Sequence, residues 1–287
     1  MSSTASSSAA AARRSYTRSP LSAISRRSIH TSTPVSLSAA VATGHAAARG
    51  AIDTPTLTTA LTYVSRRLLQ KTKEHHTFIV TGDVLFSLFF RNKAATRAVE
   101  LVHTAALTDK HKEVLVAAVL RAADKYGIER VDWVNNAGEV EMRDLGIRRE
   151  DMEELVVRSL AQKEIMFSGD GMTLLAADFR YELRLMLHKL SRELEGGEGR
   201  VSRCRSGEAG EDVGEGVGME DMVELVRRLV AVEGKGRSLR RAEIEGRYGA
   251  LVFSDSAWMA LGREYEKHFG EKGLMDEVGE PLGEDGE

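Results

Sequence analysis

Cysteine is almost missing from this sequence, because its 287 residues include one cysteine, Cys204. A single thiol cannot form a disulfide within the chain, and it excludes a metal site made of several cysteines. Arg203 and Arg205 flank this cysteine and would favour the thiolate. No general base accompanies it in the sequence, so we interpret Cys204 as an exposed thiol without a catalytic role.

Hydrophobic runs long enough to cross a bilayer are also missing. The most apolar run, TFIVTGDVLFSLFF from Thr77 to Phe90, has 14 residues and contains Asp83. A helix needs about 20 apolar residues to span the hydrocarbon core. The sequence therefore predicts no transmembrane segment.

Acidic residues are missing before Asp53. The first fifty residues are rich in Ser, Ala and Thr, and their charges come from arginine alone. An acid-free, Arg-rich stretch of this kind is typical of a mitochondrial transit peptide, which folds transiently into a basic amphipathic helix. The alternative interpretation is a disordered low-complexity tail.

The stretch RRSIHTSTPVSL resembles the known processing pattern of an arginine, a hydrophobic residue two positions later and a small hydroxyl residue three positions after that. Arg27, Ile29 and Ser32 match it here. The resemblance implies a mature chain that begins near Ile29 or Leu37. We predict a transit peptide over 1–36, a disordered linker over 37–53, and localisation in the mitochondrial matrix.

The charge is unevenly distributed once the leader is set aside. The chain has 40 basic and 43 acidic residues, and without the six arginines of residues 1–50 the balance is 34 minus 43, or −9. Residues 51–190 carry 20 of each sign, whereas 191–287 carry 14 basic and 23 acidic residues. A neutral body with an acidic end argues against broad nucleic-acid binding, which depends on Lys and Arg neutralising phosphates. A small local basic face stays compatible with these counts.

Helical segments are indicated by apolar residues at intervals of three and four. A hydroxyl residue followed by proline marks one start at Thr54, and glycine marks one end at Gly127. The predicted helices are Thr54–Lys73, Ala94–Leu107, Thr108–Gly127, Arg149–Gln162, Phe179–Gly196 and a last helix capped by Ser254 or Asp255.

Strands are indicated at two places. Thr77–Thr81 is a short apolar run, and EIMFSGDGMTLLA, Glu164–Ala176, has two apolar runs around a Gly-Asp-Gly turn, as in a hairpin. The order helix, helix, hairpin, helix over Thr108–Glu195 resembles a winged-helix domain, in which helices cover the hairpin's apolar face. We expect a mainly α protein with small β-hairpins (α+β), a helical body with a winged-helix-like module in residues 54–195.

The C-terminal third is predicted to be a separate module. Residues 196–218 are mostly Gly, Glu, Ser and Arg and predict a flexible linker, and residues 271–287 predict a loose acidic tail. Between them, 219–270 predict a small helical module that is a candidate partial repeat of 149–180. Two echoes support a repeat: EDMEELVVRSL with EDMVELVRRLV, and IMFSGDG with LVFSDSA. Acidic helix starts are common, however, since negative charge favours a helix N-terminus.

Two segments resemble the short-chain dehydrogenases. DKYGIERVDWVNNAG, which ends at Gly138, is similar to the family's helix, strand and Asn-Asn-Ala-Gly segment, and IVTG at Ile79–Gly82 looks like its first strand and phosphate loop. The resemblance implies a nicotinamide dinucleotide cofactor and a parallel sheet through both segments. The alternative for Asn135 and its neighbours is a turn after Trp133, since Asn and Gly tolerate positive φ.

The residues that would carry this chemistry are missing. The phosphate loop needs glycines so that backbone N–H groups approach the pyrophosphate, and Phe86 and Leu88 occupy two of the glycine positions. The family's Tyr-x-x-x-Lys pair is also missing, because the residue four positions after each tyrosine from Tyr63 onward is not lysine. We therefore assign no catalytic residue, cofactor or cofactor-binding residue, and we lean against an enzyme.

The spacing of the histidines along the sequence does not predict a metal site. His75 and His76, with His103 and His111, are the nearest to a cluster, but adjacent residues of a strand point to opposite sides. We interpret them as surface or capping residues and assign no metal ligand.

Candidate partner contacts lie on the helix and hairpin tip that a winged-helix resemblance would place at a groove. The tip could form an anion-binding nest, or it could use its glycines only to turn. The alternative for the helix is a solvated face on which Glu150, Glu153 and Glu154 pair with its arginines. The candidates are Arg148, Arg149, Arg158 and Lys163 on the helix, and Ser168, Gly169, Asp170 and Gly171 at the tip.

The sequence thus favours a non-catalytic matrix protein that recognises a protein or RNA partner, such as the mitochondrial ribosome, in organellar gene expression or complex assembly. The alternative function is a divergent or degenerate NAD(P)-dependent oxidoreductase of the short-chain dehydrogenase type. A structural subunit of a larger complex would have the same sequence features as the first. The sequence does not determine the oligomeric state.

Overall fold

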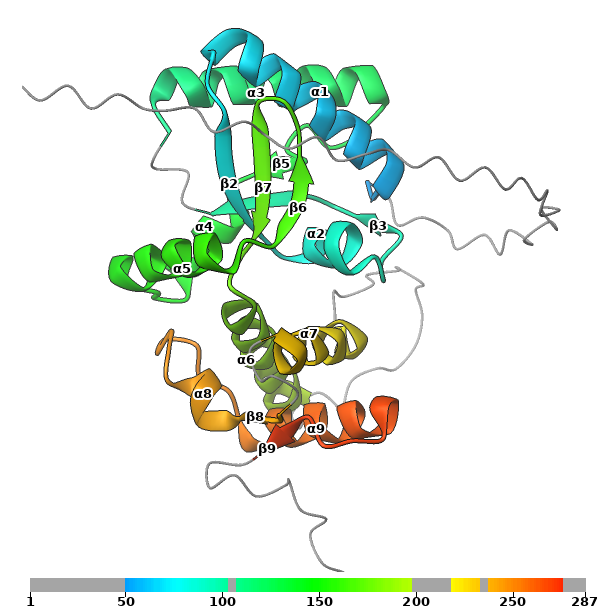
Figure 1. Cartoon of the computed structure of the whole chain (residues 1–287), viewed down its shortest axis with the longest axis vertical. Coiled ribbons are helices and arrows are strands. Elements are labelled where there is room, and N and C mark those ends of the chain that lie inside the picture. Colours follow the sequence, from blue (N-terminus) through cyan, green and yellow to red (C-terminus); the bar gives the residue numbers. More distant parts are fainter. Residues whose placement is uncertain (1–49, 103–106, 198–217, 233–236, 276–287) are drawn as a thin grey trace, which may run out of the picture. The chain divides into compact units, whose positions relative to one another are not determined.

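The structure, a computed structural model, describes residues 50–102, 107–197, 218–232 and 237–275 (Figure 1). All of these described residues belong to one compact unit. The following predictions lie outside the described residues: the transit peptide 1–36, the linker 37–53 up to residue 49, nearly all of the linker 196–218, the tail beyond residue 275, His103 and Cys204.

The described residues form an α+β structure, as predicted. None of its helices is both long and apolar enough to cross a bilayer. The helices are α1 (Thr54–Thr72), α2 (Asp83–Leu85), the π-helical turn η1 (Phe86–Phe90), α3 (Asp109–Tyr126), α4 (Ala137–Asp144), α5 (Arg149–Gln162), α6 (Phe179–Gly197), α7 (Met219–Val232), α8 (Arg241–Glu245) and α9 (Asp255–Phe269). The strands are β1 (Ile52–Asp53), β2 (His76–Thr81), β3 (Ala95–Thr96), β4 (Val99–Val102), β5 (Val134–Asn135), β6 (Ile165–Ser168), β7 (Met172–Ala176), β8 (Leu239–Arg240) and β9 (Leu274–Met275).

A five-stranded mixed sheet in the order β5-β4-β2-β7-β6 is the centre of the structure. Strand β2 pairs in parallel with β7, from His76 opposite Met172 to Val80 opposite Ala176, and antiparallel with β4. The predicted hairpin β6–β7 is confirmed and antiparallel. It is not a separate small hairpin, however, because β7 joins it to strands that precede it by about a hundred residues in the sequence.

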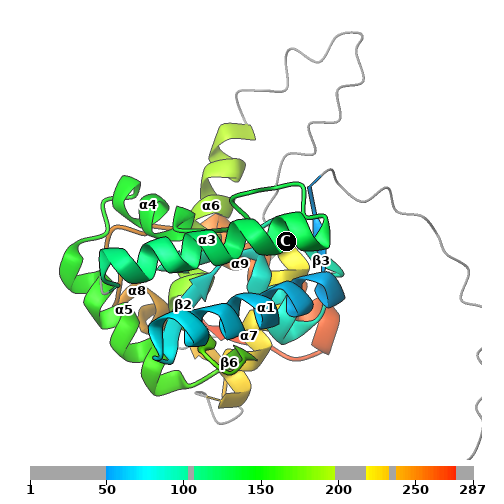
Figure 2. The ribbon, with the colours of Figure 1, turned by 90° about the horizontal axis from the view of Figure 1, so that it is seen from above.

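Side chains of β2 alternate between the two faces of the sheet. Phe78 and Val80 join a core formed with α1 and α3, and Ile79 joins a second core formed with α4, α5 and α6. Figure 2 shows α1 and α3 side by side. Both faces of the sheet are therefore covered by helices, which explains why β2 is buried at five of its six positions.

Most predicted helices are confirmed because their ends carry strong local signals. Thr108 caps α3 by accepting from the His111 N–H, Gly127 ends it in the left-handed conformation, and Ser254 caps α9. Helix α1 differs in one respect: Asp53, not Thr54, is its N-cap and accepts from the Thr56 N–H.

Two predictions on the N-terminal side are wrong. Residues 52 and 53, placed in the disordered linker, form β1, because the buried Ile52 pairs with Thr96. Residues 94–102, placed in a helix, form β3 and β4. The apolar residues of this stretch fit the spacing of a helix and also that of a strand. The strand is favoured because β4 pairs with β2 and its apolar side chains join the core.

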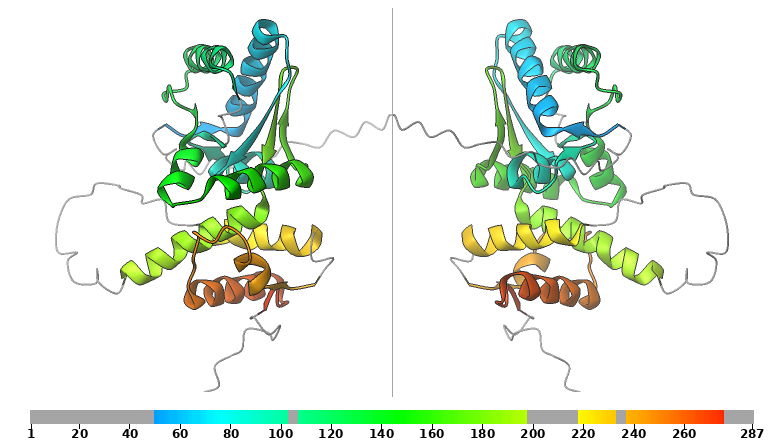
Figure 3. Two further views of the ribbon diagram at one scale, coloured as in Figure 1. Left: turned by 90° about the vertical axis from the view of Figure 1, so that its left-hand side faces the viewer. Right: turned by 90° about the vertical axis from the view of Figure 1, so that its right-hand side faces the viewer.

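Helices α6, α7 and α9 pack against one another (Figure 3). Their core includes Trp258 and Leu183, and Leu85, Phe86 and Ala176 from the sheet region join it. Polar contacts join this core to the sheet region. Lys93 contacts Asp83 at 2.8 Å and the buried Asp221 of α7 at 2.7 Å. Because Asp221 is buried, removing Lys93 would leave an uncompensated charge.

The proposed repeat is matched in one of its two echoes. EDMEELVVRSL and EDMVELVRRLV both form helices, α5 and α7. IMFSGDG forms β6 and the hairpin turn, whereas LVFSDSA forms an extended segment and the first turn of α9. The second echo therefore carries no shared structure.

The hairpin tip is held against α1. The Gly171 N–H donates to Ser65 Oγ at 2.9 Å, and a Cβ at Gly171 would lie 2.5 Å from the backbone oxygen of Ser65. Only a residue without a side chain lets the tip approach the helix this closely.

We predict that Gly171→Ala destabilises the protein by about 1–3 kcal/mol, because a methyl group at this contact forces two backbones apart. Gly196→Ala in the last turn of α6 is the matched control, since nothing lies within 4 Å of its Cβ position. Urea unfolding followed by circular dichroism measures both variants. Equal stability of the two variants would contradict this packing.

Candidate functional site

The arginines predicted as partner contacts on α5 are held in ion pairs with acids of the same helix. At least one side chain of each pair is exposed, so the pair contributes little stability, but it lowers the net charge that the helix presents to a partner. The i,i+4 pairing expected as the alternative is confirmed for two of them, and Lys163 is the exposed C-cap. The pairs are Arg148 with Asp151 at 3.0 Å, Arg149 with Glu153 at 3.0 Å and Arg158 with Glu154 at 2.5 Å.

The predicted contacts at the hairpin tip do not join those on α5. Asp170 lies 3.5 Å from Arg66 of α1, and Gly171 is buried against the same helix. Helix α1 covers one face of the sheet and α5 the other. The eight candidates therefore do not form one continuous surface.

The two dehydrogenase-like segments come together, but in a different geometry from the one implied. A Cβ at Gly138 would lie 2.4 Å from Thr81 Cγ2, so the segments touch. Strand β5 pairs in parallel with β4, however, and β4 runs antiparallel to β2. The strands that carry the two motifs therefore run in opposite directions. Phe86, at one of the phosphate-loop glycine positions, is buried and stacks on Phe90.

The Asn-Asn-Ala-Gly segment forms the turn from β5 into α4, whose first two residues are Ala137 and Gly138. Asn135 closes it, because its side-chain oxygen accepts from the Ala137 N–H at 2.8 Å and its amide donates to the Asp132 carbonyl at 2.9 Å. Positive φ, the reason expected from the sequence, is found at neither asparagine nor at Gly138. Hydrogen bonding by the asparagine side chain makes the turn instead.

A buried acid, Glu182 of α6, lies where these segments meet. Its side chain is fully enclosed, and burial raises its pKa to about 8 against weaker opposing effects of Thr81 and Lys189. Oε1 of Glu182 has no hydrogen bond of normal geometry within the described residues. A carboxyl of this kind is neutral at pH 7. Because it is only 1% exposed, a substrate cannot reach it, and we assign it a structural role.

An open hollow of about 270 Å³ lies between α1 and α3, and we call it the α1–α3 pocket. The rings of Tyr63 and Tyr126 meet edge to face, with centroids 6.1 Å apart. The ammonium of Lys125 lies 4.9 Å and 5.0 Å from the two ring centroids. The pocket thus combines aromatic rings, cations and hydroxyl groups. It is lined by Thr58, Thr59, Thr62, Tyr63, Arg66, Lys125 and Tyr126.

The threonines of the pocket offer acceptors rather than donors. Each hydroxyl donates to the backbone carbonyl four residues earlier, at 2.8 Å for Thr58 and Thr62 and 2.9 Å for Thr59. A hydroxyl whose proton is used in this way presents only oxygen lone pairs. A ligand with its own O–H or N–H donors would therefore complement these threonines.

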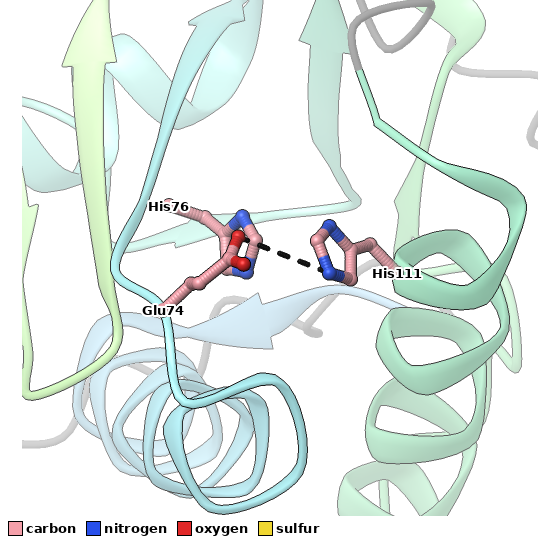
Figure 4. A group of neighbouring side chains, drawn as sticks. All are labelled: Glu74, His76 and His111. Carbon is pink, nitrogen blue, oxygen red and sulfur yellow. Dashed lines mark ion pairs between the residues drawn. The ribbon is translucent and has the colours of Figure 1, made fainter.

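Two of the predicted histidines do form a cluster, with Glu74, at the other end of the same helix pair (Figure 4). Glu74, His76 and His111 each offer one ligand atom, and these three atoms all lie within 4.8 Å of one another. His75 points elsewhere and contacts Thr173 at 2.9 Å, which confirms that the adjacent histidines diverge. Burial lowers the pKa of His76, and the neighbouring His111 lowers it further. These three residues could hold a metal ion.

Comparison with protein families gives one match. A family described as a domain of unknown function (DUF7582) matches residues 50–272, which include the elements from β1 to α9. The chain belongs to this family. Comparisons with curated proteins and with solved structures find no match. The matched residues thus include the sheet and the helices on both of its faces, and the family description assigns no activity.

Sequence reasoning missed both sites on the α1–α3 pair. Tyr63 and Tyr126 are 63 positions apart, and His76 and His111 are 35 apart, so no short motif joins them. For the histidines the signal was their number near His76 and His111, which spacing alone did not support as a site, and for the pocket it was the lack of acidic residues between Thr54 and Lys73, a stretch with four cations.

We predict that Glu182→Gln flattens the pH dependence of stability. The folded pKa of about 8 exceeds the ordinary glutamate value of 4.5, so the folded chain binds more protons than the unfolded chain between these two pH values. Wild-type stability therefore falls as pH rises through this window, by on the order of 4 kcal/mol in total. Glutamine keeps the shape of the neutral acid and removes the loss.

Urea unfolding at pH 5.5 and at pH 8.5 measures this difference. Glu113→Gln, at an exposed position of α3, is the control and should keep the wild-type slope. A Glu182→Gln variant with the wild-type slope would contradict the assignment of a buried, protonated carboxyl.

Proposed function

We propose that this protein is a non-catalytic recognition protein of the mitochondrial matrix that binds single-stranded RNA through the α1–α3 pocket. The observation that carries the proposal is the grouping of Tyr63 and Tyr126 with Arg66 and Lys125 in one open hollow of about 270 Å³. A hollow of this size is below the range typical of larger cofactors and suits a single nucleotide unit.

The chemistry of the pocket matches the parts of a ribonucleotide. Aromatic rings stack on bases, and cations neutralise the phosphates of the backbone. The hydroxyl oxygens of Thr58, Thr59 and Thr62 can accept from the 2′-hydroxyl of ribose and from base amino groups. DNA lacks that hydroxyl donor, so RNA is the better complement.

The positive charge of α1 also favours RNA binding at the α1–α3 pocket. Residues 54–73 contain Arg66, Arg67, Lys71 and Lys73 and no acidic residue. Arg66 has an acidic neighbour, Asp170, at 3.5 Å with both side chains 65% exposed, and such a pair is weak and easily exchanged for a phosphate. The face is the small local basic surface that a neutral body still allows.

Recognition of a partner through α5, as in a winged-helix-like module, remains a second prediction. In that mode α5 would enter a groove and Arg148, Arg149, Arg158 and Lys163 would contact the partner. The ion pairs on α5 favour the α1–α3 pocket over it. The matrix location rests on the composition of residues 1–50 alone. The oxidoreductase alternative gains no support from the opposed motif strands.

We predict that Arg66→Gln with Lys125→Gln weakens binding of a fluorescent single-stranded RNA to the full chain roughly tenfold, measured by anisotropy. Loss of two phosphate contacts should also make the negative slope of log affinity against log salt concentration shallower by about 1.4. Arg148→Gln with Arg149→Gln is the matched control, because it removes the same charge from α5. Equal losses in both double variants, or loss in the control alone, would contradict the proposal.

A protein partner is the other outcome of the same series. A chain that binds no RNA at low salt, but is captured with a protein after nuclease treatment, would refute RNA binding. The same double variants would then show which face contacts that protein.

A further inference from the structure

We infer that Glu74, His76 and His111 form a binding site for a zinc-class divalent cation. The site is independent of the pocket, because it lies at the opposite end of the α1–α3 pair and shares no residue with it (Figure 4). Two imidazoles and one carboxylate are a donor set that suits Zn²⁺, whereas Mg²⁺ and Ca²⁺ prefer oxygen ligands alone.

The positions of the ligands are nearly right for one ion. Their ligand atoms lie within 4.8 Å of one another. Around a tetrahedral Zn²⁺, ligand atoms are about 3.3 Å apart, given bonds of about 2.0–2.1 Å. Glu74 can close the difference, because its side chain is 63% exposed and free to rotate, whereas that of His111 is 17% exposed.

The two histidines are fixed by rigid elements. His76 is the first residue of β2, and its N–H donates to the Gly171 carbonyl at 3.0 Å. His111 lies in the first turn of α3, where its N–H is bound by the capping Thr108. The rings meet edge to face at 4.9 Å. A site with two fixed ligands and one adjustable ligand loses little conformational entropy on binding.

Thr72 prepares His76 as a ligand. The Thr72 hydroxyl donates to the Leu68 carbonyl at 2.8 Å, so its oxygen, 3.1 Å from His76 Nε2, favours the tautomer of His76 that carries its proton on Nε2. Nδ1 of His76 then keeps its lone pair for a cation. A hydrogen bond from the second ring nitrogen is the usual support of a metal-bound histidine, and it fixes the tautomer. Thr72 is therefore a positioning residue.

Three protein ligands leave a fourth position for water. This is the arrangement of zinc sites that are open to a small ligand, as opposed to closed structural sites with four protein ligands. The exposed side of Glu74 gives solvent a path to that position. Without an ion, the same residues would form only a weak ion pair, since His111 Nε2 and Glu74 Oε2 are 3.9 Å apart.

The test is isothermal titration of the full chain with Zn²⁺. We expect one ion per chain bound through this site, and a loss of affinity of at least tenfold in His111→Asn and in Glu74→Gln. Both residues have partly or largely exposed side chains, so both variants should fold. His75→Asn is the matched control, because the adjacent ring contacts Thr173 and not the cluster. It should bind Zn²⁺ as the wild type does.

Thr72→Val adds a readout that a merely structural cluster would not change. Loss of the histidine's supporting hydrogen bond should lower zinc affinity roughly 10–100-fold, and Thr72→Ser should restore it. Zn²⁺ should also raise the melting temperature of the wild type and not that of His111→Asn. Absence of Zn²⁺ binding, or equal binding by His111→Asn and the wild type, would overturn the site. Equal binding by Thr72→Val and the wild type would overturn the role of Thr72.

Discussion

The parallel pairing of β2 with β7 is the interaction on which the other features depend. It joins segments almost a hundred residues apart, from His76 opposite Met172 to Val80 opposite Ala176. At one end of this pairing the hairpin tip meets α1 through Ser65 and Gly171. At the other end, Thr81 reaches the start of α6 beside Glu182. The pairing therefore fixes α1 on one face of the sheet and α6 on the other.

The α1–α3 pair, once fixed in this way, carries both proposed sites. The helices are antiparallel, since Tyr63 of α1 meets Tyr126 at the end of α3, whereas Glu74, which follows α1, meets His111 at the start of α3. The open pocket has charge and rings at the surface, and the histidine cluster lies partly enclosed at the start of the central strand β2. Glu182 differs from both, because an enclosed carboxyl whose pKa is raised by burial destabilises the fold at neutral pH and is out of reach of a substrate. Perturbed titration alone would have indicated the wrong site.

Much of the helical framework could be predicted from the sequence, because its signals are local. Helix α5 begins and ends at the predicted residues, Gly127 ends α3 as predicted, and Ser254, one of the two residues predicted as the cap, caps α9. Strand β4 could not be predicted, since its apolar residues fit a helix equally well and only the edge of β2 decides between them. The two-residue strands β1 and β5 likewise exist only through their partners. Both sites on the α1–α3 pair depend on long-range packing, so no motif announces them.

The central claim is that the molecule recognises RNA at the α1–α3 pocket. Ultraviolet crosslinking of the full chain to single-stranded RNA, with the attached peptides identified by mass spectrometry, tests it most directly. The account predicts crosslinks at Tyr63 or Tyr126. Crosslinks confined to α5 or to the hairpin tip, or no crosslinks at all, would contradict it.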